Sequence, residues 1–288
     1  MKRFVRMGLP AVMVAMELAA LASHAEAQAR RRWQRRTAPV AVPVTVFHST
    51  QAANLPTAEM LEGGEWLFEI SHRFLPAISE GAQALWGFDG TAYIRLGLAW
   101  APTSRLMVGV QRTNLNDNLE LNAKARLAEG RSGELSWMVG AMGGIAWNTD
   151  PPQVAGVSDN ETQAYGQLIL DAGLGRSFAV GVVPTVLRNP RLEDTSADNA
   201  FVLGLHAQAY LAEAFSLLAE WIVSDSRPDQ EHDAFTAGVE LETGGHFFKI
   251  VVTNQMRPNP TQTLGGSPFP VALDELRVGF NITRLLAF

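Results

Sequence analysis

Apolar and polar residues alternate along most of the chain beyond residue 63. In GEWLFEISHRF, residues 64–74, Trp66, Phe68 and Ile70 fall on one face, with polar residues between them. A period of two is typical of a β-strand with one apolar face. Twelve segments follow this pattern, at residues 64–74, 92–100, 105–113, 119–127, 134–147, 164–175, 178–187, 201–211, 215–224, 234–242, 246–255 and 275–288.

The links between these segments alternate between short and long. Short turns such as 101–104 (APTS) and 175–177 (GRS) separate longer links such as 148–163 and 256–274. Transmembrane barrels combine short periplasmic turns with long outer loops and usually have an even number of strands. The pattern therefore predicts an all-β fold, a closed antiparallel up-and-down transmembrane β-barrel of about 12 strands.

Aromatic residues mark both ends of the predicted strands. Those at the short-turn ends are Trp66, Trp100, Trp137, Phe178 and Phe215, and those at the long-loop ends are Phe74, Trp147 and Phe201. Two aromatic girdles are what the two lipid interfaces of a membrane favour. A soluble β-sandwich packed by these rings is the alternative, but its other strand faces would be unusually polar and rich in glycine.

The last segment ends in RVGFNITRLLAF. Its apolar face carries Phe280, Ile282, Leu286 and Phe288, although Arg284 interrupts the row. This pattern resembles the C-terminal strand by which bacterial outer-membrane barrels are recognised, so the barrel-assembly machinery is an expected partner. We expect this strand to pair with the first one, because a lipid-embedded sheet cannot leave an open edge.

The N-terminal residues are typical of an exported protein. Lys2, Arg3 and Arg6 precede an apolar stretch and a small-residue cleavage site at Ala27, so residues 1–27 are predicted to be a signal peptide. Residues 28–63 form a basic, Pro-containing N-terminal arm, and residues 64–288 form the barrel. The arginines from Arg30 to Arg36 either touch acidic groups or belong to a solvated, disordered arm, which we expect.

Composition excludes several classes of function. The chain has 47% hydrophobic residues, no cysteine and a formal net charge of −6. The lack of cysteine excludes disulfides and thiolate metal sites, and the negative charge disfavours nucleic-acid binding. Since no run of about 18 apolar residues follows residue 27, a helical membrane span is not expected, and the predicted location is the bacterial outer membrane in contact with its lipid.

Charged residues of both signs fall on the predicted inner faces. Those singled out as a selectivity filter or a plug network are Glu69, Arg73, Arg95, Lys124, Arg126, Glu220, Glu240 and Lys249. Arg73 and Arg95 are expected near the outer mouth, where they either attract an anionic solute or pair with Glu69 and Asp89. The many inward glycines either leave room for a pore or let a loop or tail pack inside.

Catalytic and metal-binding patterns are weak. The chain contains neither G-x-S-x-G nor H-E-x-x-H, and the neighbouring Ser71 and His72 face opposite sides of their strand. The acidic residues between Asp225 and Asp233, with His232, match no defined cation loop. We therefore expect no enzymatic activity, no cofactor and no metal.

A family resemblance rests on several short motifs. They are Val46-Phe47-x-Ser49, Ile70 to Phe74 with His72 and Arg73, Trp86 to Asp89, and Arg95 with Gly97. In these the chain resembles a family of bacterial outer-membrane β-barrels of unknown function, although Leu75 and Phe88 depart from the family pattern. The resemblance implies the fold and the location but no substrate.

Two functions remain open at this stage. The first is a narrow channel for small solutes, suggested by the glycine-lined and charged inner face. The second is a closed barrel that acts as a membrane anchor or scaffold for periplasmic or surface partners, suggested by the balanced lumen charges and the basic arm. An open lumen favours the first and a plugged lumen favours the second.

Overall fold

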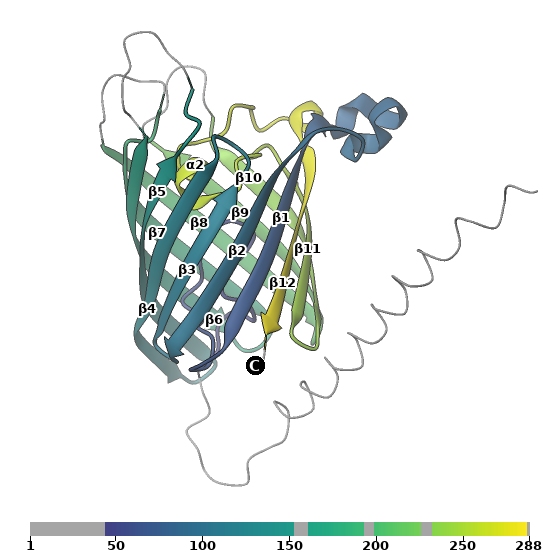
Figure 1. Ribbon diagram of the computed structural model, residues 1–288. Coiled ribbons are helices and arrows are strands. Elements are labelled where there is room, and N and C mark those ends of the chain that lie inside the picture. Colours follow the sequence, from purple (N-terminus) through teal and green to yellow (C-terminus); the bar gives the residue numbers. More distant parts are fainter. Residues whose placement is uncertain (1–43, 153–160, 193–198, 226–231, 287–288) are drawn as a thin grey trace, which may run out of the picture.

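The computed structural model describes residues 44–152, 161–192, 199–225 and 232–286. In these residues twelve strands form one closed antiparallel barrel, in which each strand pairs with its neighbours in the chain (Figure 1). The strands are β1 (Trp66–Ala77), β2 (Ala92–Thr103), β3 (Leu106–Thr113), β4 (Asn118–Ser132), β5 (Leu135–Asn148), β6 (Thr162–Leu174), β7 (Phe178–Arg188), β8 (Asn199–Ala212), β9 (Phe215–Ser224), β10 (Ala234–Thr243), β11 (His246–Thr253) and β12 (Arg277–Leu286). The predicted fold class is confirmed.

The barrel closes between its first and last strands. β1 pairs with β12 from Trp66 opposite Leu286 to Arg73 opposite Gly279, so the described sheet has no free edge. The apolar row of β12 faces outward, because Phe280 stacks on the outward ring of His72 with ring centroids 5.0 Å apart. The predicted pairing of the two terminal strands is therefore confirmed, while Phe288 lies outside the described residues.

The hairpin of β4 and β5 extends beyond the predicted segment, which ended at residue 127. A register shift between Arg126 and Ala128 lets the two strands stay paired as far as Ser132 opposite Leu135. Gly133 then makes the turn with a positive φ of 61°. The sequence suggested a longer turn here because polar residues and glycine occur on both faces of this part of the hairpin.

The outward faces of the strands are apolar and aromatic. Trp66 and Trp100 stack at the short-turn rim with ring centroids 5.7 Å apart. Leu168 and Leu203 are among the large hydrophobic side chains exposed between the two rims. Apolar residues at these positions have a favourable place only against lipid, while the inward faces of the same strands bury charges and amides.

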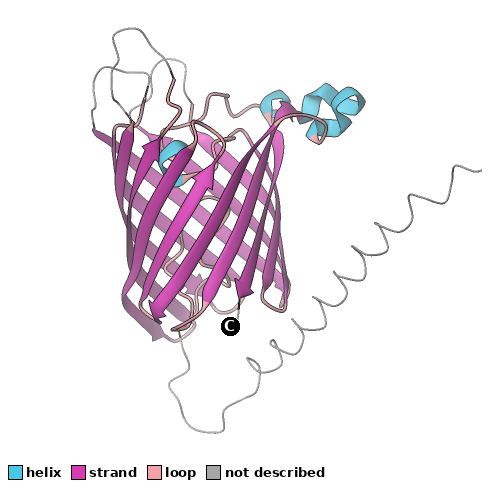
Figure 2. Cartoon of the chain, viewed as in Figure 1, coloured by secondary structure: helices cyan, strands magenta, loops and turns pink. Residues whose placement is uncertain are grey.

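Helical turns occur only in the outer loops of the described chain (Figure 2). They are η1 (Ile78–Gly87) between β1 and β2, and α2 (Pro260–Thr263) and η2 (Leu273–Glu275) between β11 and β12. Among the described residues no helix combines the length and the apolar character that crossing a membrane requires.

Two segments depart from the expected arrangement because they fold into the lumen. Residues 44–61, predicted to belong to a solvated arm, are largely buried inside the barrel. Residues 254–267 are largely buried as well, although 254–255 were predicted to end a strand and 256–267 to belong to an outer loop. We call these two segments the inner plug and the outer plug. Neither segment has an alternating pattern. Each is held by polar groups of the surrounding wall and not by a continuous strand ladder, so nothing requires a period of two.

Candidate functional site

The inner plug is a re-entrant loop that enters and leaves at the short-turn rim. Its two arms meet through an isolated antiparallel bridge between Gln51 and Pro56. The amide of Thr57 donates to the carbonyl of Thr50 at 3.1 Å, and the chain turns at residues 52–55. Figure 1 shows this purple segment inside the barrel wall. The loop therefore presents its turn to the middle of the lumen and both of its ends to the periplasmic rim.

Glu220 of β9 binds the turn of the inner plug. Its carboxylate accepts hydrogen bonds from the amides of Ala53 (2.7 Å), Asn54 (2.8 Å) and Leu55 (2.9 Å). The side-chain amide of Asn54 adds a fourth bond at 2.8 Å. Successive backbone N–H groups in a turn form an anion-binding nest, so the buried charge and the unpaired amides satisfy each other.

Two lysines bind the carbonyl groups of the inner plug. The ammonium group of Lys124 on β4 donates to the carbonyls of Thr50 (2.9 Å), Thr57 (2.9 Å) and Glu59 (2.7 Å). Lys249 on β11 donates to the carbonyls of Gln51 (2.5 Å) and Ala52. Each ammonium has three donors, which match the several carbonyl groups that the plug turns toward the wall.

Lys249 also forms a buried ion pair with Glu240 of β10, at 3.1 Å. The second oxygen of Glu240 accepts a hydrogen bond from the side-chain amide of Gln208 at 2.6 Å. Ser49 of the inner plug contacts both ions, because its hydroxyl lies 2.9 Å from the Lys249 ammonium and 3.2 Å from the Glu240 carboxylate. The plug thus completes the coordination of a pair that would otherwise be buried with few partners.

Arg73 and Arg95 lie side by side on the inner wall of β1 and β2 and bind different plugs. The Arg73 guanidinium donates to Asn54 of the inner plug at 2.8 Å and to Asn281 of β12 at 2.7 Å. Arg95 forms a salt bridge with Glu69 and donates to the carbonyl of Pro258 in the outer plug at 2.6 Å. Asp89, which was considered as a partner, is exposed in the first outer loop.

Two further carboxylates bind the arms of the inner plug. Glu59, at the end of the descending arm, accepts from the amides of Val46 (2.6 Å) and Phe47 (3.1 Å), and Arg126 of β4 lies 3.7 Å from it. Asp171 of β6 accepts from the amide of Ala58 at 2.7 Å. Asp171 was not among the predicted site residues, since an isolated acidic residue in a strand gives no sign of its partner.

Glycines on the inner wall provide the space for the inner plug. A Cβ atom at Gly204 would lie 2.7 Å from the side chain of Leu55, and one at Gly140 would lie 3.3 Å from that of Ala58. Contacts this close leave no room for a side chain. The inward glycines were therefore the signal in the sequence that the lumen holds a segment of chain. They let a loop or tail pack inside, which was one of the two explanations that the sequence suggested; the other was an open pore.

The outer plug caps the opposite end of the lumen. Asn259 donates to Asn118 at 2.5 Å, and the amide of Thr261 donates to Glu120 at 3.3 Å. Leu264 of the outer plug and Leu55 of the inner plug belong to one buried apolar cluster with side chains of β6 to β10. The two plugs therefore meet in an apolar layer that separates the outer end of the lumen from the inner end.

Two small cavities lie beside the plugs in the described lumen. One cavity of about 80 Å³ lies between them and is lined by Leu55, Gln167 and Leu264, among others. A second of about 160 Å³ opens at the periplasmic rim beside His48 and Phe247. Liquid water occupies about 30 Å³ per molecule, so each of these two cavities has room for only a few water molecules.

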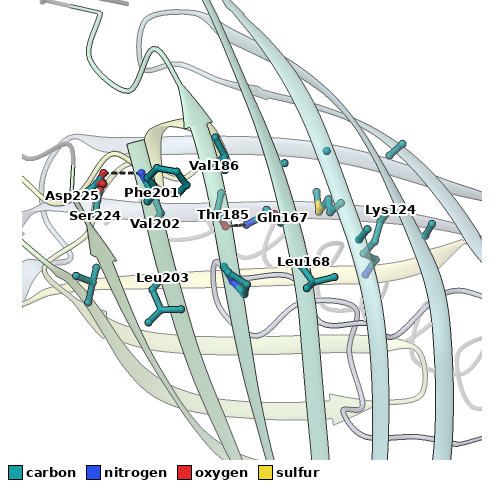
Figure 3. A pocket seen from close by; sticks show the side chains of 18 of the residues that line it. Lys124, Gln167, Leu168, Thr185, Val186, Phe201, Val202, Leu203, Ser224 and Asp225 are labelled. Atoms are coloured by element: carbon teal, nitrogen blue, oxygen red, sulfur yellow. Dashed lines mark hydrogen bonds between the residues drawn. The ribbon is translucent and has the colours of Figure 1, made fainter. Parts of the chain in front are cut away.

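A larger hollow of about 1100 Å³ lies on the outside of the wall between β3 and β9 (Figure 3). Leu168, Val186 and Leu203 line it, and the labelled pair Gln167 and Thr185 is joined by a hydrogen bond of 3.2 Å on the lumen side. Because its lining is mostly apolar and faces outward, this hollow belongs to the lipid-facing surface and not to the lumen site.

Other residues considered in the sequence lie apart from the lumen site. Ser71 points into the lumen and His72 points to lipid, so the two do not meet. The described residues contain no cluster of three or more acidic or histidine side chains that could hold a metal ion. Within the acidic loop, residues 226–231 lie outside the described residues.

The closed barrel, its apolar outer faces and its filled lumen define a transmembrane β-barrel protein of the outer-membrane class. More particularly, the chain belongs to the family described as membrane bound beta barrel domain (DUF5777), whose model matches residues 47–286. The matched range includes most of the inner plug. No curated protein matches the chain significantly.

Several solved structures are similar in fold. A NanC porin is 10% identical, with a TM-score of 0.48, over 77% of this chain and 100% of that one. The COG4313 outer membrane channel from Pseudomonas putida F1 is 13% identical, with a TM-score of 0.48, over 80% and 98%. Outer membrane phospholipase A from Escherichia coli is 12% identical, with a TM-score of 0.41, over 87% and 94%. At this distance the named activities remain properties of those proteins.

Proposed function

We propose that this protein is a closed outer-membrane barrel that anchors its N-terminal residues at the periplasmic face, where they meet a partner. The observation that carries the proposal is the occupation of the lumen charges: Glu220, Lys124 and Lys249 all bind the backbone of the inner plug. A charge that is satisfied by the plug is not available to a passing solute. The family match from residue 47 supports the plug as part of the barrel domain.

The orientation of the plug supports a periplasmic anchor. The described chain begins at Val44, which lines the same rim cavity as Leu285 near the end of β12. Any residue that precedes the plug is therefore tethered to this side of the membrane by a rigid barrel. The arginines between Arg30 and Arg36 lie outside the described residues, and in this proposal they bind an acidic periplasmic partner.

Planar-bilayer recording tests the closed state. The intact protein is expected to give no discrete conductance steps. In a double variant with Ala53→Cys and Leu218→Cys, whose native side chains share a buried cluster, oxidation should form a disulfide that locks the plug to β9. The chain has no other cysteine, so reduction is a clean control. The closed barrel would be overturned by discrete steps in the intact protein and in the reduced double variant that are absent from the oxidised double variant.

Deletion of residues 28–43 tests the anchor, because it leaves the described plug in place. We expect loss of a co-purifying periplasmic protein with no change in heat-modifiable migration of the barrel. The matched control replaces the arginines from Arg30 to Arg36 with glutamine, which keeps the length and removes the charge. An unchanged set of co-purifying proteins in both variants would contradict the anchor.

A narrow channel with a movable plug is the second candidate. It is favoured by the cavity of about 80 Å³ between the plugs, which the unpaired side-chain oxygen of Gln167 borders. Displacement of the inner plug would join this cavity to the periplasmic one and expose a charged, glycine-lined wall. The conductance experiment separates the candidates, since only a channel conducts when the plug is free to move.

A further inference from the structure

The first outer loop exposes an apolar surface that no described residue covers. Leu85 is 54% exposed, Trp86 57% and Phe88 54%, and in the last outer loop Leu273 is 88% exposed and Val271 41%. The two loops touch, because the hydroxyl of Ser79 donates to the carbonyl of Asp274 at 2.7 Å. We call these five side chains the rim patch. Soluble surfaces rarely gather so many large apolar side chains in two short loops.

The backbone of η1 holds the rim patch in a defined shape. Leu85 and Trp86 have φ values of 46° and 53°, a left-handed conformation that residues with bulky side chains rarely adopt. The following amides close the turn, since Phe88 donates to the carbonyl of Leu85 at 3.3 Å and Asp89 to that of Ala84 at 3.1 Å. The turn keeps the side chains of Leu85 and Trp86 exposed although its backbone is strained. This indicates that the two side chains have a partner outside the chain.

The rim patch continues the outer aromatic girdle of the barrel. The ring of Phe88 packs against that of Phe74 with centroids 5.5 Å apart. Phe74 faces outward on β1, where it neighbours Phe280 and His72. Such girdles lie at the level of the lipid headgroups, so contact with Phe74 places Phe88 at that level. Figure 2 shows η1 projecting sideways from the barrel rim in place of covering the mouth.

Polar residues accompany the apolar ones in both loops. Ser79, Glu80, Gln83 and Asp89 are exposed in the first loop, and Asp274 is exposed next to Leu273. An amphipathic segment of this kind lies in the interface plane, with its apolar side in the boundary between headgroups and acyl chains and its polar side in water. The polar residues therefore have a place that a fully buried protein contact would not give them.

We propose that the rim patch is a lipid-binding foot that inserts Leu85, Trp86 and Leu273 into the outer leaflet beside β1 and β12. Its ligand is the apolar boundary of the leaflet just below the headgroups. The foot fixes the height and the tilt of this side of the barrel. The proposal goes beyond the closed barrel and does not depend on the plug, because the foot would have the same role whether the lumen is closed or conducts.

Single-cysteine labelling tests the foot, because the chain contains no natural cysteine. Trp86→Cys and Leu273→Cys carry an environment-sensitive fluorophore, and the matched controls are Gln83→Cys and Asp274→Cys, which are exposed in the same two loops. Each variant is reconstituted in phospholipid vesicles with and without a nitroxide quencher near the headgroups. We expect quenching by lipid at positions 86 and 273 to be at least about twofold stronger than at 83 and 274.

Two outcomes would overturn the proposal. Equal quenching at all four positions, together with equal access of iodide from water, would place the rim patch in solvent. Pyrene at position 86 that forms an excimer with a second copy, with no quenching by lipid, would assign the patch to a contact between barrels. Because all four positions are exposed, the substitutions are not expected to affect folding, and heat-modifiable migration of each variant verifies this.

Discussion

Several buried charges in the lumen are satisfied by backbone groups of the plugs. Glu220 accepts three amides of one turn, and Lys124 donates to three carbonyls of the same segment. An ion removed from water without such partners costs several kcal/mol, so the wall and the plug depend on each other. Individual wall charges therefore control whether the plug stays in place.

Glu220→Ala is expected to loosen the inner plug, because it leaves three turn amides buried without an acceptor. Each unsatisfied buried donor costs about 1–3 kcal/mol, so the plug should leave its site at least about a hundredfold more often. The measurement is the maleimide labelling rate of Ala53→Cys, which is fully buried at the turn. Glu134→Ala, in an exposed hairpin turn, is the control and should leave the rate unchanged.

The rim end of the inner plug should respond to pH through His48. Burial lowers the pKa of His48, but the hydrogen bond and negative charge of Glu242, with the charges of Glu240 and Glu59, outweigh it and raise the pKa above the usual value. A raised histidine pKa stabilises the folded contact below the unfolded value of about 6.5, and this stabilisation is lost as pH rises through the folded pKa.

Amide exchange of residues 45–49, corrected for intrinsic rates, measures this effect. We expect greater protection at about pH 5.5 than at about pH 8.5, by at most about fivefold, because the 3.2 Å pair with Glu242 is partly exposed. His48→Gln should reduce the difference; the part that remains is expected from Glu59, whose pKa is raised to about 7 by burial and which accepts the amides of Val46 and Phe47. An undiminished pH dependence in this variant would show that His48 is not responsible.

At the scale of strands, close approach between neighbours fixes where glycine is required. A Cβ atom at Gly238 on β10 would lie 2.2 Å from the carbonyl oxygen of Ile250 on β11. The obstacle is backbone, which cannot move without breaking the ladder between these strands. A Cβ atom at Gly166 on β6, by contrast, would have no neighbouring atom within 4 Å.

Gly238→Ala is therefore expected to destabilise the barrel by about 1–3 kcal/mol, as overpacking does elsewhere. Gly166→Ala, on the open lipid-facing side, should be nearly neutral. Urea unfolding of both variants in detergent, followed by heat-modifiable migration, compares them directly. Equal midpoints for the two variants would contradict the steric argument.

At the scale of the whole molecule, closure of β1 on β12 removes the two edges that an open sheet would expose to lipid. β12 is the closing strand, and its outward row includes Phe280 and Ile282. We therefore expect assembly and stability to depend on the same few residues. The plugs then fill the lumen from both ends without contributing to closure.

Deletion of Phe288 is expected to reduce the amount of assembled barrel more than deletion of an outer loop such as residues 153–160. The reason is the resemblance of the last strand to the signal read by the barrel-assembly machinery. The measurement is the fraction of heat-modifiable protein in outer-membrane preparations. If the deletion variant assembles to the same level as the intact protein, Phe288 is not part of the assembly signal. Refolding of the purified variant in detergent is the control, because it measures barrel stability without the assembly machinery.

The order of strands, their faces and the closure of the barrel were determined by the sequence alone. Alternation in segments such as 64–74 encodes which side chains meet lipid, and alternating loop lengths encode which rim each link occupies. Ion pairing of Arg95 with Glu69 follows from their places on neighbouring strands. These features are local or involve adjacent strands, so a period of two carries them.

Only the tertiary structure decided what fills the lumen. The inner plug has no alternation, and its partners Glu220, Asp171 and Lys249 lie more than a hundred residues away in the chain. Isolated acidic and basic residues in strands do not reveal whether they bind each other, a solute or a backbone turn. That choice depends on the shape of the space inside the closed wall, where Gly204 and Gly140 admit Leu55 and Ala58.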